Sequence, residues 1–160
     1  MPFKIYPFNL VICLAIFLPN LLMLFFPPVN VPQQKNENWI WNVVVVLERI
    51  GQVSLFILPL FWKIRTSDRK ITYILIAMAL LLLLYYAIWT RYLLNKCQFA
   101  SMFQSLFYIP IPLALAPIVY FALAGILLES WPVIIAAVIF ALGHIPESLR
   151  NLALSQIPIK

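Results

Sequence analysis

Residues 71–94 read ITYILIAMALLLLLYYAIWTRYLL, and Arg91 is the one charged residue among them. A helix of about 20 mostly apolar residues is long enough to cross the ~30 Å hydrocarbon core of a bilayer. This stretch exceeds that length, and five consecutive leucines, residues 80–84, lie near its middle. The stretch therefore predicts a transmembrane helix.

The composition of the whole chain supports the same conclusion. The 160 residues are 64% hydrophobic and 10% charged, whereas a soluble domain is about half apolar and a quarter charged. The mean hydropathy is +0.99. A soluble fold of this length could not bury so much apolar surface. The composition thus indicates an integral membrane protein, and it excludes a soluble enzyme, a nucleic-acid-binding domain and a disordered regulator.

Four further apolar segments flank residues 71–94. We therefore expect an all-α integral membrane protein, with a bundle of about five transmembrane helices in a single transmembrane domain, 1–160. Residues 1–26 resemble a signal peptide, but they lack a small-residue cleavage site, so we interpret them as a retained first span. The expected spans are residues 6–26, 39–62, 71–94, 107–128 and 132–151.

Pro146 makes the last expected span irregular. A proline inside a helix removes a backbone donor and disfavours helical geometry in the residue before it, so the helix should be kinked or broken near Ile145. Residues 132–145 alone would form a helix of about 21 Å, which is too short to cross. Either the helix kinks and continues to about Leu154, or it stops and a short interfacial helix begins at Pro146.

The basic residues predict how the chain is oriented. Cytoplasmic loops carry an excess of Lys and Arg. We therefore expect a plasma-membrane protein with a cytoplasmic N-terminus and an external C-terminus. Such loops also account for the net charge of +6, so no nucleic-acid partner is expected. The loop between the second and third spans contains the basic residues Lys63, Arg65, Arg69 and Lys70, against the single acidic residue Asp68.

Polar residues inside the spans are the candidate functional residues. An ionisable side chain at the centre of a span costs about 2.5–3.5 kcal/mol on insertion scales, so it needs a partner or a purpose. The alternating directions of the spans place the ionisable candidates in the outer half of the bilayer, which predicts a shared polar pocket there. The candidates are Glu48, Arg49, Gln52, Arg91, His144 and Glu147.

The residue types favour binding of an amphiphile with an anionic headgroup, either a membrane lipid or a lipid-linked substrate. Arg49 and Arg91 can hold a phosphate or carboxylate, and we assign Gln52 and Glu147 to the same binding role. Glycine at position 51 permits close approach of a neighbouring helix beside them.

Glu48 and His144 are the candidate catalytic residues, because either could move a proton on the bound headgroup. The sequence leaves open whether the amphiphile is modified, and therefore whether the protein is an enzyme. One histidine beside an arginine makes a poor ligand set, so we expect no metal site and no cofactor.

Two other functions are compatible with the same residues. A carboxylate within a span is typical of proton-coupled transporters, and a five-span transporter would have to act as a homo-oligomer. A non-catalytic accessory subunit would meet a membrane protein partner inside the bilayer. In that case the charges would be packing devices: Glu48 and Arg49 would pair across helices, Arg91 would extend to the interface, and His144 would be buried.

Overall fold

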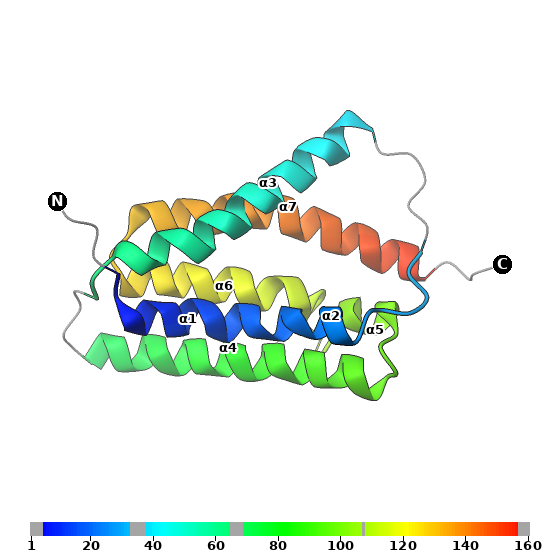
Figure 1. Ribbon diagram of the computed structural model, residues 1–160, viewed down its shortest axis with the longest axis horizontal. Helices are drawn as coiled ribbons and strands as arrows, with labels where there is room; N and C mark the ends of the chain where they lie inside the picture. Colours follow the sequence, from blue (N-terminus) through cyan, green and yellow to red (C-terminus); the bar gives the residue numbers. More distant parts are fainter. Residues whose placement is uncertain (1–4, 33–37, 65–68, 107, 157–160) are drawn as a thin grey trace.

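A computed structural model describes residues 5–32, 38–64, 69–106 and 108–156. The termini, residue 107, and Arg65 and Asp68 of the basic loop lie outside these ranges. The described chain is a bundle of long helices that lie side by side and run alternately in opposite directions (Figure 1). No β-strand occurs within the described ranges, which contain two isolated β-bridges. The predicted all-α class is confirmed.

Four helical segments are long and apolar enough to cross a membrane, and a fifth apolar helix is shorter. The protein is therefore a membrane-embedded helical bundle. The first segment joins α1, the 3₁₀ turn η1 and α2, and the second joins α3 and the 3₁₀ turn η2. The bounds are α1 Pro7–Phe17, η1 Leu18–Leu21, α2 Leu22–Phe25, α3 Trp39–Ile57, η2 Leu58–Phe61, α4 Arg69–Leu94, α5 Phe99–Phe103, α6 Pro112–Leu127 and α7 Trp131–Ser155.

Helix α6 begins later than the expected span 107–128. The chain first makes a turn in which Tyr108 and Ile111 adopt positive φ values of 64° and 41°. A residue before proline is pushed out of the helical region, so Ile111 cannot extend the helix backwards from Pro112. Proline itself fits the first helical position. At 16 residues the helix is about 24 Å long.

Helix α7 runs without a break from Trp131 to Ser155 and includes Pro146. Of the two expected alternatives, the structure has the continuing helix and not a separate interfacial one. Stopping at Ile145 would leave several carbonyl groups without donors at membrane depth, whereas the proline removes only one donor. The longer helix is therefore the less costly solution.

A side chain from α4 replaces a backbone hydrogen bond that is missing at a proline in the first segment. Pro19 has no N–H to donate to the carbonyl of Ala15, four residues earlier. The helix tightens to a 3₁₀ turn at this point, and the Tyr86 hydroxyl donates to the Ala15 carbonyl at 3.0 Å. The bond satisfies a carbonyl that no water can reach in the bilayer, and it ties α1 to α4.

Pro59 creates the same gap in the second segment. The carbonyl of Leu55 loses its donor, and the thiol of Cys13 lies 3.7 Å from that oxygen. The amide nitrogen of Asn9 donates to the Pro59 and Trp62 carbonyls at 2.7 and 2.6 Å. Side chains of α1 thus satisfy the irregular end of the second segment.

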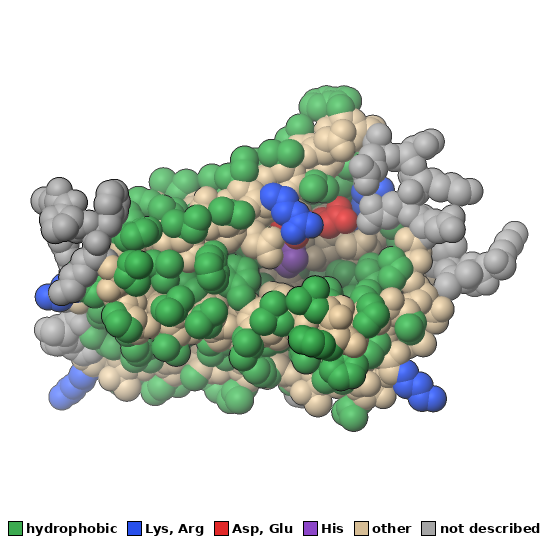
Figure 2. All heavy atoms as spheres, viewed as in Figure 1, with side chains coloured by type: hydrophobic (Ala, Val, Ile, Leu, Met, Phe, Trp, Pro, Cys, Tyr) green, Lys and Arg blue, Asp and Glu red, His purple; other side chains and the backbone are tan. Residues whose placement is uncertain are grey.

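The core lies where α1, α4, α6 and α7 meet. Its largest side chains include Trp89 and Tyr92 of α4 and Phe121 of α6, each no more than 2% exposed. Apolar side chains also cover much of the face shown in Figure 2. Leu80 and Leu83, for example, are 61% and 67% exposed, as expected for side chains that face lipid.

Candidate functional site at the crossing of α3 and α7

Helices α3 and α7 cross with their backbones in direct contact. A Cβ atom added to Gly51 would lie 2.5 Å from the Cα atom of Phe140, and one added to Gly143 would collide with the backbone of Glu48. Small residues permit this close approach between membrane helices. Beyond the crossing, the N-terminal half of α3 leaves the bundle (Figure 1). The opening beside the contact belongs to a pocket lined in part by Gln52 of α3 and by Phe140 and His144 of α7.

Glu48 and His144 face each other at this crossing. Oε1 of Glu48 lies 2.8 Å from Nδ1 of His144, and the two side chains are 16% and 22% exposed. The Phe140 ring stacks on the imidazole, with ring centroids 4.5 Å apart and an angle of 17°. Because an ionised carboxylate only accepts hydrogen bonds, Nδ1 donates and a neutral imidazole keeps Nε2 as an acceptor. Glu48 and Phe140 together fix the orientation of the ring.

Arg49 is an exposed residue of α3. Its Nη1 donates to Oε1 of Gln52 at 3.3 Å. In the view of Figure 2, a basic side chain (blue) is seen close to the purple side chain of the single histidine. Arg49 follows Glu48 directly on α3, and its partner Gln52 lines the same pocket as His144.

A small pocket with a partly polar lining lies inside the bundle, and Gln52, the partner of Arg49, is one of its lining residues. Its volume is about 50 Å³, and its lining comes from the first two spanning segments and from α4, α6 and α7. The polar lining residues are Asn20, Gln52, Tyr85 and His144, and three phenylalanine rings contribute to the rest. The hydroxyl of Tyr85 donates to Oδ1 of Asn20 at 2.9 Å. The pocket therefore joins the Glu48–His144 pair to a second polar pair.

Arg91 is not part of this pocket. Its guanidinium donates to the carbonyl oxygens of Ser101, Gln104 and Ser105 at 2.7, 2.8 and 3.0 Å. These carbonyls lie within and just after α5, where the last turn of a helix leaves acceptors unpaired. The structure thus gives Arg91 a role in holding the loop after α4.

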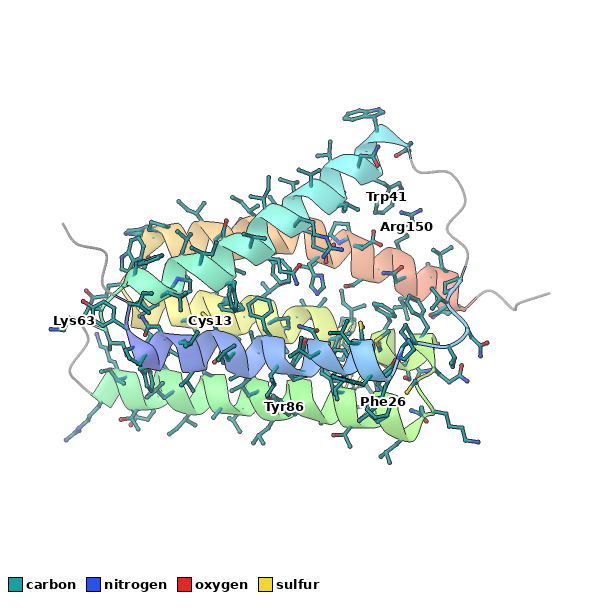
Figure 3. The ribbon with its side chains drawn as sticks, viewed as in Figure 1. Cys13, Phe26, Trp41, Lys63, Tyr86 and Arg150 are labelled. Atoms are coloured by element: carbon teal, nitrogen blue, oxygen red, sulfur yellow. The ribbon has the colours of Figure 1, made fainter. Side chains whose placement is uncertain are left out.

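Glu147 follows His144 by three residues on α7 but belongs to a separate polar group. Its Oε2 lies 4.0 Å from Nη1 of Arg150, and its Oε1 accepts a hydrogen bond of 3.4 Å from Asn151. The Arg150 guanidinium stacks 4.5 Å from the centre of the Trp41 ring, and Figure 3 shows the two side chains meeting between α3 and α7. This contact bridges the diverging ends of the two helices.

The structure brings together Glu48 and His144, and also Arg49 and Gln52, as the predicted shared pocket requires. Sequence reasoning missed Asn20 and Tyr85. Asn20 was detectable, because an amide inside an apolar span is costly unless it is paired. Tyr85 carried no such signal, since a tyrosine in a span also suits a lipid-facing position.

Within the described ranges, no three His, Cys, Asp or Glu side chains are grouped so as to hold a metal ion. No protein-family model matches the chain, and neither a curated protein nor a solved structure is similar to it.

Proposed function

We propose that this protein binds an amphiphile with an anionic headgroup at the opening between α1, α3 and α7. The observation that carries the proposal is the position of Arg49. Its guanidinium is exposed within an apolar span, and among the described residues its one hydrogen-bond partner is the neutral amide of Gln52. A charge at this depth is costly unless an anion compensates it. A phosphate or carboxylate reaching in from the lipid phase would do so with two parallel hydrogen bonds.

The Glu48–His144 contact supports the same proposal. Glu48 is next to Arg49 in sequence, yet its carboxylate pairs with the histidine 2.8 Å away. The guanidinium of Arg49 is therefore not hydrogen-bonded by Glu48, and its N–H groups remain available to a ligand. A fixed imidazole beside the bound headgroup could also exchange a proton with it, and this would make the protein an enzyme.

The pocket would open toward the outer leaflet of the plasma membrane. Lys63 is exposed at the end of the bundle opposite to the C-terminal end of α7 (Figure 3), and α4 begins at that same end with the exposed residues Arg69 and Lys70 (Figure 1). The excess of basic residues in cytoplasmic loops supports an internal location for that end. Labelling of cysteines introduced at Lys63 and at Gln156 in a Cys97→Ser background, with a reagent that cannot cross the membrane, tests this orientation, because native Cys97 is a free and partly exposed thiol. Labelling of Gln156→Cys alone in intact cells is expected, and labelling of Lys63→Cys alone would reverse the orientation.

Native mass spectrometry of the purified protein with added lipids tests the binding. We expect phosphatidylglycerol to bind more tightly than zwitterionic phosphatidylcholine. Replacing Arg49 by Gln should weaken phosphatidylglycerol about tenfold, because a hydrogen bond to a charged group contributes about 1.5–3 kcal/mol. The matched control is Lys96→Gln, which removes an equal charge from an exposed position outside the opening. Equal losses in both variants would refute a specific site at Arg49.

A proton-coupled transporter is the second candidate, favoured by the Glu48–His144 pair within the spans. A transporter of this size would need more than one copy to enclose a path. In reconstituted vesicles, Glu48→Gln should then abolish the pH dependence of substrate exchange while leaving exchange itself measurable. Exchange that keeps its pH dependence in the variant would count against this candidate.

A further inference from the structure

Some polar atoms of the residues that line the pocket already form hydrogen bonds, and other polar atoms of the same side chains could bind a ligand. Oδ1 of Asn20 accepts from Tyr85, Oε1 of Gln52 accepts from Arg49, and Nδ1 of His144 is bound to Glu48. The amide nitrogens of Asn20 and Gln52 therefore remain as donors, and Nε2 of a neutral His144 remains as an acceptor. Among the described residues, none of these three atoms has a hydrogen-bond partner of its own.

Two donors and one acceptor fit a hydroxyl group. A hydroxyl group accepts two hydrogen bonds and donates one, which is the complement of two donors and one acceptor on residues that line one pocket. A carboxylate or phosphate oxygen, by contrast, would meet the imidazole acceptor with no proton to share. The free atoms of the pocket thus select for O–H rather than for a second anionic oxygen.

The size of the pocket agrees with this chemistry. Its volume of about 50 Å³ exceeds the roughly 10–15 Å³ needed to hold one water molecule. The rings of Phe17, Phe121 and Phe140 form part of the wall, so a larger polar group would lie against apolar surface. His144 is 22% exposed and is visible from outside in Figure 2, so its ring can be reached from that face.

We propose that the pocket binds a hydroxyl group carried by the headgroup of the amphiphile that Arg49 holds. Gln52 connects the two positions, because its side chain accepts from Arg49 and also lines the pocket. The ligand class is then an anionic amphiphile whose headgroup carries a free hydroxyl next to its phosphate or carboxylate. This inference rests on the proposed function and makes it more specific.

The test compares two lipids of equal charge in native mass spectrometry. Phosphatidylglycerol has free hydroxyls beyond its phosphate, and phosphatidylmethanol has none. A hydrogen bond contributes about 0.5–1.5 kcal/mol net, so the wild-type protein should prefer phosphatidylglycerol about 2- to 10-fold. In His144→Phe, which keeps an aromatic ring against Phe140 but loses Nε2, the preference for phosphatidylglycerol should fall, because the hydroxyl proton loses its acceptor.

The outcomes separate this inference from the proposed function. Equal binding of the two lipids to the wild-type protein, with both weakened by Arg49→Gln, would overturn the hydroxyl site and leave the anionic site in place. That is also the result expected if water alone fills the pocket. Binding of both lipids that Arg49→Gln does not change would overturn the proposed function as well.

A measurement on the wild-type protein keeps the test decisive if His144→Phe does not fold. The chain contains one histidine, so ¹⁵N-histidine labelling reports on His144 alone. In bilayers, solid-state NMR should show a protonated Nδ1, together with an Nε2 resonance that shifts with phosphatidylglycerol and not with phosphatidylmethanol. A protonated Nε2 with an unprotonated Nδ1, or equal shifts with both lipids, would overturn the inference.

Discussion

Nδ1 of His144 and Oε1 of Glu48 lie 2.8 Å apart at the point where α3 and α7 touch. The contact joins two helices whose sequences are 96 residues apart, and it lies close to mid-length in both. Each side chain alone would be costly at that depth. Together they form a polar pair that a ligand can reach from the side.

Removing one member of the Glu48–His144 pair should destabilise the protein. Glu48→Leu should lower the free energy of unfolding by about 1–3 kcal/mol, because the imidazole loses its partner in a largely apolar environment. Combining it with His144→Phe should cost less than the sum of the two single changes, since the double variant leaves no polar group unpaired. Unfolding monitored in detergent for all four proteins gives the coupling energy. Additive effects would mean that the 2.8 Å contact contributes nothing to stability.

Gly143→Ala should separate α3 from α7. The added methyl group would collide with the backbone of Glu48, and the backbone cannot move aside as a flexible side chain can. We expect a loss of at least about 2 kcal/mol together with weaker lipid binding, because the opening is formed by this crossing. Val53→Ala on the exposed face of α3 serves as the control. A Gly143→Ala protein that melts like this control would contradict the backbone contact.

Tyr86→Phe tests whether the tyrosine hydroxyl replaces the backbone donor that is missing at Pro19. The variant loses the hydroxyl that donates to the carbonyl of Ala15, and stability should fall by about 1 kcal/mol. Tyr73→Phe, on the 70% exposed Tyr73 of the same helix, should change stability by less than half as much. If the two variants are equally stable, the hydroxyl of Tyr86 does not replace the donor missing at Pro19.

Replacing Arg91 should lower the stability of the protein without changing its lipid preference. Arg91→Gln removes the charged donor that holds three carbonyl oxygens, so thermal stability should fall by about 1.5–3 kcal/mol. The preference for anionic over zwitterionic lipid should stay within about twofold of wild type. Loss of that preference in Arg91→Gln at unchanged stability would return Arg91 to the binding site and contradict its structural role.

The fold was largely predictable from sequence because lipid imposes a length and an apolar character on every span. The spans around α1, α3, α4 and α7 follow from hydropathy alone. The start of α6 at Pro112 required knowing that Ile111 takes a positive φ. The continuity of α7 through Pro146 depended on comparing the cost of one lost donor with the cost of a helix end at membrane depth.

The sequence predicted the depth of the candidate site in the membrane, but it did not predict which side chains would contact each other. Helical rise places Glu48 and His144 near one level, so their proximity could be expected. The rotation of each helix about its axis decides which side chains meet, and the glycines at positions 51 and 143 fix that rotation through tertiary contact. The sequence predicts a similar depth for Arg91, yet its side chain binds carbonyl oxygens within and just after α5. The depth of a residue in the membrane therefore limits which side chains could form the site, and helix packing determines which of them meet.

Photo-crosslinking with a phosphatidylglycerol analogue that carries a diazirine near its headgroup tests the central claim most directly. Mapping the labelled peptides in bilayers should show attachment concentrated around Arg49 on α3 and His144 on α7. Excess phosphatidylglycerol, but not phosphatidylcholine, should compete with this labelling, and Arg49→Gln should abolish it. Labelling spread evenly over the lipid-facing surface, and unchanged by Arg49→Gln, would contradict a headgroup site at this opening.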